Sequence, residues 1–100
     1  MTTHVVMWQF KETVSEDQKD ALKKDMKENL EGLMGKIPGL LEIKFISTLL
    51  PSSTHDAALI AKYESAEAIE VYSSHPAHVH VADTYVRPFV CNRACLDFVD

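Results

Sequence analysis

The chain has 100 residues, of which 46% are hydrophobic and 25% are charged, and its formal net charge at pH 7 is −5. This length suits one domain with a single core, so we expect residues 1–100 to fold as one unit. The acidic balance excludes a nucleic-acid partner, because phosphate contacts need a basic face. No apolar run approaches the roughly 18 residues of a membrane span, so we also expect no membrane partner.

The first predicted element is a strand over residues 4–11. Its side chains alternate in character with a period of two, which is typical of a strand. One face carries His4, Val6, Trp8 and Phe10. We expect Trp8 and Phe10 to belong to the core or to the wall of a pocket.

A long amphipathic helix follows this strand. Ser15 and Gln18 have the spacing of a capping box. Apolar residues then recur every three or four positions from Leu22 to Ile37, which predicts one buried helix face. The Pro38–Gly39 pair ends the predicted helix.

The rest of the chain completes an α+β pattern. We expect strands over residues 40–49, 57–63 and 89–99, and helices from Ser65 through Tyr72 and from Ala77 to Tyr85. Pro76 separates the two helices, because proline is tolerated only in the first turn of a helix. The order is therefore β-α-β-β-α-β with a broken second helix. It predicts a ferredoxin-like fold, in which a four-stranded antiparallel sheet carries helices on one face only.

The bare face of that sheet is predicted to be apolar. Val5, Met7, Ile46, Leu96 and Phe98 fall on or near the side away from the helices. Such a face is too apolar for a solvated surface. Packing it against a second copy of the same sheet would bury it, so we expect a homodimer through the sheet face.

Three of the five histidines lie in the run Y-S-S-H-P-A-H-V-H, residues 72–80. His75 precedes a proline, which favours extended backbone and a capping role over metal ligation. His78 and His80 are two positions apart and face different directions on a helix. No CxxC or HExxH spacing accompanies them. We therefore expect no metal and no other cofactor.

His78 is the candidate for chemistry in this run. Removing a proton next to a carbonyl requires a base whose pKa lies near neutrality, as that of imidazole does. Asp97 would hold the imidazole in one tautomer, and Tyr72 would donate its hydroxyl to a developing enolate oxygen. The alternatives are a purely structural His78–Asp97 hydrogen bond and a core tyrosine. A nearby carboxylate would raise the pKa of His78, whereas burial would lower it.

The two cysteines, Cys91 and Cys95, give information on the cellular compartment, because disulfides form in oxidising ones. On an extended strand their Cα atoms would lie about 13 Å apart, too far for a disulfide. The N-terminal residues lack the cationic start and the cleavage site of a signal peptide. We therefore expect reduced thiols in a cytoplasmic protein.

Taken together, several motifs resemble a known family. They are the strand opening at His4, the I-P-G-L exit of the first helix, the Y-x-x-H-P-x-H run and the L-D-F stretch of the last strand. The chain is similar through its whole length to the stress-responsive dimeric α/β-barrel family, often called Dabb. The resemblance implies a homodimeric α/β barrel with a cavity in each monomer between the helices and the sheet.

The resemblance also implies roles for individual residues. One plant member is a polyketide cyclase that closes a linear thioester by aldol condensation without a metal. The histidine matching His78 is its base, the tyrosine matching Tyr72 assists, and the aspartate matching Asp97 holds the histidine. The ligand-binding residues expected here are His4, Trp8, Leu22, Met26 and His75.

The chain departs from the cyclase in its predicted pocket wall. Ala57 stands where the cyclase has a further histidine, and Leu22 and Met26 stand where it has aromatic residues. The resemblance therefore carries over the reaction type but not the substrate. Three functions follow: a cofactor-free cyclase or lyase acting on a carbonyl compound, a non-catalytic stress protein that holds a small apolar ligand, and a barrel of the monooxygenase kind. The H-P-A-H run disfavours the third.

Overall fold

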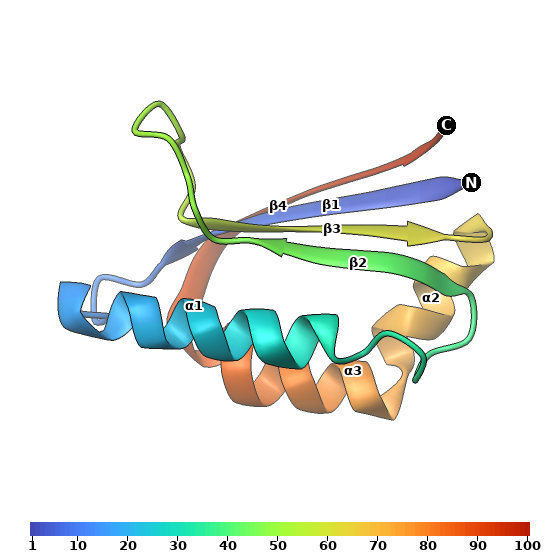
Figure 1. Cartoon of the computed structure of the whole chain (residues 1–100), viewed down its shortest axis with the longest axis horizontal. Helices are drawn as coiled ribbons and strands as arrows, with labels where there is room; N and C mark the ends of the chain where they lie inside the picture. The colour runs from blue at the N-terminus through green and yellow to red at the C-terminus, as the bar shows by residue number, and fades with distance from the viewer.

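A computed structural model describes residues 1–100, and its elements follow the predicted order (Figure 1). The strands are β1 (Thr2–Phe10), β2 (Leu40–Ile46), β3 (Ala57–Tyr63) and β4 (Val90–Val99). The helices are α1 (Glu16–Glu31), α2 (Ala66–Ser74) and α3 (Pro76–Val81). A π-helical turn (Ala82–Val86) and a 3-10 turn (Arg87–Phe89) join α3 to β4.

The four strands form one antiparallel sheet in the order β2-β3-β1-β4. All three helices lie on one side of this sheet, as Figure 1 shows. The loop between β2 and β3 projects past the opposite side. The predicted ferredoxin-like α+β fold is therefore confirmed.

The central strand β1 has two different faces. His4, Val6, Trp8 and Phe10 are buried on the helix side, as the alternation of the sequence predicts. Residues directly opposite one another in an antiparallel pair share a face of the sheet. The register therefore places Asp97 of β4 beside His4 on the helix side.

The first helix is shorter than predicted. α1 ends at Glu31 instead of continuing to Ile37. The backbone then turns, and Gly35 adopts a φ of 83°, a left-handed conformation that glycine accepts without strain. Leu33 and Ile37 are nevertheless buried. The helical spacing of the sequence thus continues into a turn that packs on the same core.

The second strand also departs from the prediction. β2 ends at Ile46, and its pairing with β3 shifts between Leu40 and Glu42. Leu41 is the extra residue of a β-bulge, and a bulge resets the alternation of side chains. As a result Leu40 and Phe45 are buried, while Leu41, which strict alternation would place on the face of Phe45, is exposed.

The break between α2 and α3 lies at Pro76, as predicted. Ser65 caps α2, since its Oγ accepts a hydrogen bond from the amide of Ala68 at 3.3 Å. His75 caps α3 from an extended backbone, with φ −65° and ψ 132°. Its Nδ1 accepts a hydrogen bond from the amide of Ala77 at 3.1 Å. The cap role predicted for His75 is confirmed.

The side of the sheet away from the helices is apolar. Met7, Leu96 and Phe98 are 36%, 62% and 42% exposed on it. By register, Val5 lies between Ile60 and Leu96 on the same side. We call this surface the outer face; it comprises Val5, Met7, Ile46, Ala58, Ile60, Ala94, Leu96 and Phe98.

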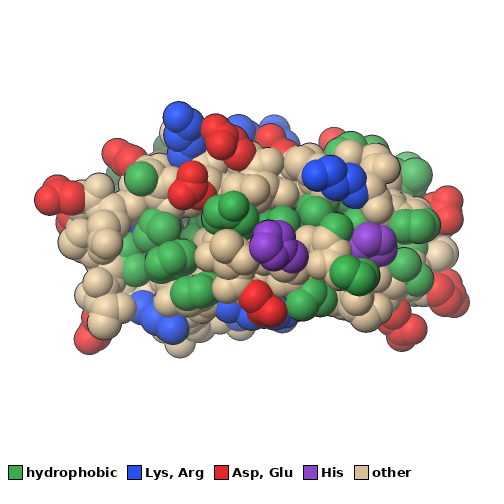
Figure 2. All heavy atoms as spheres, turned by 90° about the horizontal axis from the view of Figure 1, so that it is seen from below, with side chains coloured by type: hydrophobic (Ala, Val, Ile, Leu, Met, Phe, Trp, Pro, Cys, Tyr) green, Lys and Arg blue, Asp and Glu red, His purple; other side chains and the backbone are tan.

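The helix side of the molecule has a different character. Figure 2 shows charged side chains along its margins, with hydrophobic and histidine side chains between them. None of the helices combines the length and the apolar character that a membrane crossing requires.

Candidate functional site

A cavity of about 470 Å³ lies between the sheet and the helices. Its apolar wall includes Val6, Trp8, Leu30, Leu59, Val86 and Val90. Its polar wall includes His4, Tyr72, Ser73, His78, Arg87 and Arg93. A mostly apolar cavity of this size with a few convergent polar groups is typical of a site for a small organic molecule.

Tyr72 lines the cavity and carries a buried hydroxyl. The residue is 2% exposed, and its ring centroid lies 5.4 Å from that of Tyr63 and 4.2 Å from that of His78. The hydroxyl of Tyr72 has no hydrogen-bond partner within the protein. Burial raises its pKa above the ordinary value, so the group stays protonated at neutral pH. It is therefore a hydrogen-bond donor that has no acceptor within the protein.

His78 presents a neutral imidazole to the same cavity. Its Nδ1 lies 3.2 Å from the carbonyl oxygen of Ser73. A carbonyl oxygen only accepts, so Nδ1 carries the proton and Nε2 keeps a free lone pair. Burial lowers the pKa of His78, the bond to Ser73 opposes this, and the positive charges of Arg87 and Arg93 lower it further. The net effect places the pKa below 6.5, so the ring is uncharged at pH 7.

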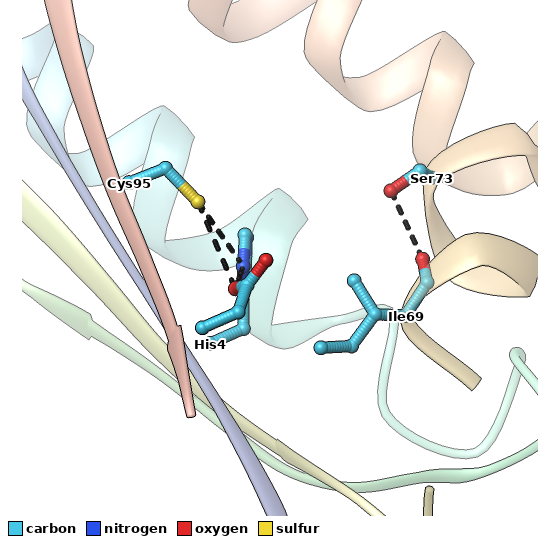
Figure 3. A network of polar contacts seen from close by, with 5 residues as sticks. His4, Ile69, Ser73 and Cys95 are labelled. Atoms are coloured by element: carbon cyan, nitrogen blue, oxygen red, sulfur yellow. Dashed lines mark hydrogen bonds and ion pairs between the residues drawn. The ribbon is translucent and has the colours of Figure 1, made fainter. Parts of the chain in front are cut away.

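Asp97 has a different partner from the one predicted. Its Oδ1 accepts a hydrogen bond from Nδ1 of His4, which faces it across the β1–β4 pair. Cys95 Sγ lies 3.7 Å from each of these two atoms, and Figure 3 shows it pointing toward His4. The predicted His78–Asp97 pair is therefore wrong. The register of the strands places the Asp97 carboxylate next to His4 of β1. His78 instead forms its hydrogen bond with a backbone carbonyl of α2.

The atoms of His4, Cys95 and Asp97 that could bind a metal lie within 4.8 Å of one another. The prediction of no metal site rested on the histidine run and did not consider this group, whose members come from two strands. Burial, followed by the charge of Asp97, raises the pKa of the Cys95 thiol. The thiol therefore keeps its proton, and a metal would have to displace that proton and the one between His4 and Asp97.

The predicted ligand-binding residues divide into two groups. His4 and Trp8 line the cavity. Leu22, Met26 and His75 do not. Met26 is 0% exposed within the core, Leu22 packs against that core, and the Nδ1 of His75 is occupied by the cap. Through Leu30, α1 contributes to the wall one turn beyond Met26.

Four polar residues of the wall were missed in the sequence: Ser73, Arg87, Asn92 and Arg93. Ser73 acts through its backbone carbonyl, which no side-chain pattern reveals. Arg87 and Arg93 are the chain's two arginines, and both line the cavity. A signal existed for Arg93, because the alternation of an extended strand places it on the same face as Cys95 and Asp97. The two cysteines are free thiols, as predicted, and the cellular location stays a prediction.

The family assignment rests on the whole chain. The family model described as the stress responsive A/B barrel domain, Dabb, matches residues 2–100. The chain belongs to this family. The resemblance of the His4 strand, the Y-x-x-H-P-x-H run and the L-D-F stretch to Dabb proteins is thereby confirmed.

Solved structures share the fold of this Dabb chain. A dimeric protein of unknown function from Bacteroides fragilis is 25% identical with a TM-score of 0.88, over 97% of this chain and 93% of that one. A dimeric ferredoxin-like protein of unknown function from Thermobifida fusca is 23% identical with a TM-score of 0.77, over 97% and 88%. Hydroxynitrile lyase from Passiflora edulis is 19% identical with a TM-score of 0.70, over 97% and 90%. No functionally curated protein matches the chain by sequence.

The first prediction concerns the protonation of His78. We expect its pKa, followed by NMR of the imidazole nitrogens, to lie below 6.5. Arg87→Gln should raise that pKa, because it removes a positive charge that disfavours the imidazolium. Lys24→Gln, which removes an exposed charge from α1, should leave it unchanged. A wild-type pKa at or above 6.5 would contradict this description of the site.

Proposed function

We propose that this Dabb protein is a cofactor-free enzyme that moves a proton at a carbon next to a carbonyl group, as a cyclase or lyase does. One observation carries the proposal: the Nδ1 of His78 is bonded to a carbonyl oxygen, so its Nε2 is left unprotonated on a ring whose centroid lies 4.2 Å from that of Tyr72, and the hydroxyl of Tyr72 is unpartnered. A base and a hydrogen-bond donor next to one another are the two groups that enolate chemistry needs.

The proton transfer begins at His78. In the proposed step, Nε2 takes the proton from the carbon next to the substrate carbonyl, and the electron pair moves onto the carbonyl oxygen. The low pKa of His78 keeps the base neutral at pH 7. Tyr72, held protonated by burial, donates a hydrogen bond to the enolate oxygen as its charge develops.

The reaction then follows one of two balanced courses. In a cyclase, the enolate carbon attacks a second carbonyl carbon of the same molecule, a carbon–carbon bond forms, and the proton on His78 passes to the new alkoxide. In a lyase, the same steps run in reverse and the carbon–carbon bond breaks. Neither course consumes an oxidant, a reductant or a cofactor. The fold shared with hydroxynitrile lyase is compatible with chemistry of the second kind.

Asp97 enters this proposal as a positioning residue. Its carboxylate holds the Nδ1 of His4, and His4 lines the same cavity as His78. A carboxylate at one ring nitrogen fixes the orientation and the tautomer of a histidine. His4 would therefore present its Nε2 to a ligand carbonyl in one fixed direction.

A second function is favoured by a specific observation. His78 has an uncharged carbonyl as its partner, where a carboxylate would stabilise the imidazolium that a base becomes. An apolar cavity with a weakly basic imidazole also suits a stress protein that binds a small ligand without turnover. The two functions share the cavity and differ only in proton transfer.

The protein acts as a homodimer through the outer face in this proposal. The support is the exposed apolar surface around Leu96 and Phe98, together with the dimeric relatives from Bacteroides fragilis and Thermobifida fusca. A stable dimer of this kind buries about 1,200 Å² or more in total. Two sheets packed face to face through these surfaces form the α/β barrel that the family description names.

The test of catalysis uses exchange of carbon-bound protons in D₂O, followed by ¹H NMR. A panel of phenylacetone, 4-oxopentanoate and 3-oxo-thioesters covers the carbonyl compounds concerned. We expect at least one to exchange faster with the protein, and the rate to fall as pH drops through the lowered pKa of His78, because the imidazolium has no lone pair. His78→Ala should reduce the rate by about 100-fold or more, and Tyr72→Phe should reduce it by less.

The matched control is His80→Ala. His80 is exposed on the same helix and does not line the cavity, so its loss should leave the exchange rate unchanged. If no compound exchanges although several of them quench the fluorescence of Trp8, the enzyme proposal fails and the non-catalytic function stands. An equal loss of rate in the His80 variant would also contradict the role of His78.

The dimer is tested by sedimentation at micromolar concentration. We expect wild-type protein to sediment as a dimer, and Leu96→Asp to sediment as a monomer because it places a charge within the buried outer face. Val71→Asp changes an exposed apolar residue on α2, away from the sheet, and should stay dimeric. A stable wild-type monomer would overturn the proposal.

A further inference from the structure

Both arginines of the chain line the cavity, and no aspartate or glutamate does. This distribution runs against the composition, since the chain has 15 acidic residues and a net charge of −5. The eight lysines, which supply the remaining positive charges, lie outside the cavity wall. The cavity is therefore a positively charged region inside an acidic protein.

Arg93 lies in the wall at a point where the pairing of β4 with β1 is irregular. The pairing with β1 passes from Ala94 opposite Met7 to Cys91 opposite Gln9, so two residues of β4 stand opposite Trp8. This is a β-bulge, and Asn92 within it has a left-handed φ of 51°. Bulges occur next to binding sites, where they redirect side chains. Alternation along β4 places Arg93 on the helix side with Cys95 and Asp97, and the bulge lets its neighbours Cys91 and Asn92 line the cavity as well.

The two arginines differ in how far their charge is neutralised. Arg87 Nη1 lies 2.5 Å from Asp83 Oδ1, four positions earlier in the chain. Arg93 forms no ion pair. The positive charges of Arg87 and Arg93 both act on His78. Each disfavours the imidazolium form and so lowers the pKa of His78. An anion bound between them would relieve this repulsion.

The rest of the wall limits the kind of anion. Trp8, Leu30 and Leu59 are buried apolar residues that line the same cavity. A fully hydrated inorganic anion would gain nothing from these surfaces, whereas an organic molecule would bury its carbon skeleton against them. Arginine matches a carboxylate group through two parallel hydrogen bonds, which favours this group at the polar end.

We infer that the cavity selects an organic carboxylate, whose anionic group lies at Arg87 and Arg93 and whose apolar body lies against Trp8, Leu30 and Leu59. The inference rests on the proposed function, because it names the class of molecule that the same site takes. In the enzyme proposal the substrate becomes a carbonyl compound that also carries a carboxylate, with its reactive carbon at His78.

The test compares phenylacetate with phenylacetamide, two probes of equal shape that differ in charge. Binding is followed by the fluorescence of Trp8, the only tryptophan of the chain, and by calorimetry. We expect wild-type protein to bind the acid about tenfold more tightly than the amide or better, since a hydrogen bond to a charged group is stronger than one to a neutral group. Raising the salt concentration should weaken the binding of the acid and leave the binding of the amide unchanged.

The decisive variant is the double change Arg87→Gln and Arg93→Gln. It should bring the acid-to-amide affinity ratio close to one through loss of acid affinity, with a much smaller change in the affinity of the amide. Retained binding of the amide also reports that the cavity is still folded. The control is Lys24→Gln with Lys36→Gln, which removes the same charge from exposed positions outside the cavity and should preserve the ratio.

Two results would overturn the inference. The first is equal affinity of wild-type protein for the two probes, and the second is an unchanged acid-to-amide ratio in the double arginine variant. Either result would show that the arginines do not select carboxylates, although the cavity binds ligands. Absence of binding by both probes would overturn the inference together with the proposed ligand cavity. The two failures are therefore distinguishable.

Discussion

The break at Pro76 is the constraint on which the candidate site depends. A proline in the interior of a helix costs about 3 kcal/mol or more, so α2 must end before it. In a continuous helix the carbonyl of Ser73 would accept a hydrogen bond from the amide of Ala77. That amide instead donates to the Nδ1 of His75, which leaves the Ser73 carbonyl to accept from His78. The end of one helix thus fixes the tautomer of the base on the next.

This arrangement separates two histidines that the sequence does not distinguish. His78 is half-buried, is held by a neutral carbonyl and lies in the field of two arginines, so its uncharged form is favoured. His4 is held by the carboxylate of Asp97, half exposed on the edge strand β4. One cavity therefore contains an imidazole suited to accepting a proton and another that is oriented by a negative charge. The ring of Tyr72, whose hydroxyl is buried, lies beside the first of them.

The sequence predicts the fold better than it predicts the contacts of the site. Alternation identifies β1, caps identify α2 and α3, and the run from Tyr72 to His78 identifies one side of the cavity. The partner of Asp97 could not be predicted, because the register of β1 against β4 pairs it with a residue 93 positions away in the chain. The bulges at Leu41 and Asn92 likewise depend on strand pairing, and a bulge changes which side chains share a face.

The tautomer of His78 tests the central claim most directly. Long-range ¹H–¹⁵N NMR at pH 7.5 distinguishes a protonated Nδ1 from a protonated Nε2 by their nitrogen chemical shifts. The hydrogen bond to the Ser73 carbonyl predicts a neutral ring with the proton on Nδ1 and an unprotonated Nε2. A proton on Nε2, or a doubly protonated ring at this pH, would contradict the account of His78 as a base held by the end of α2.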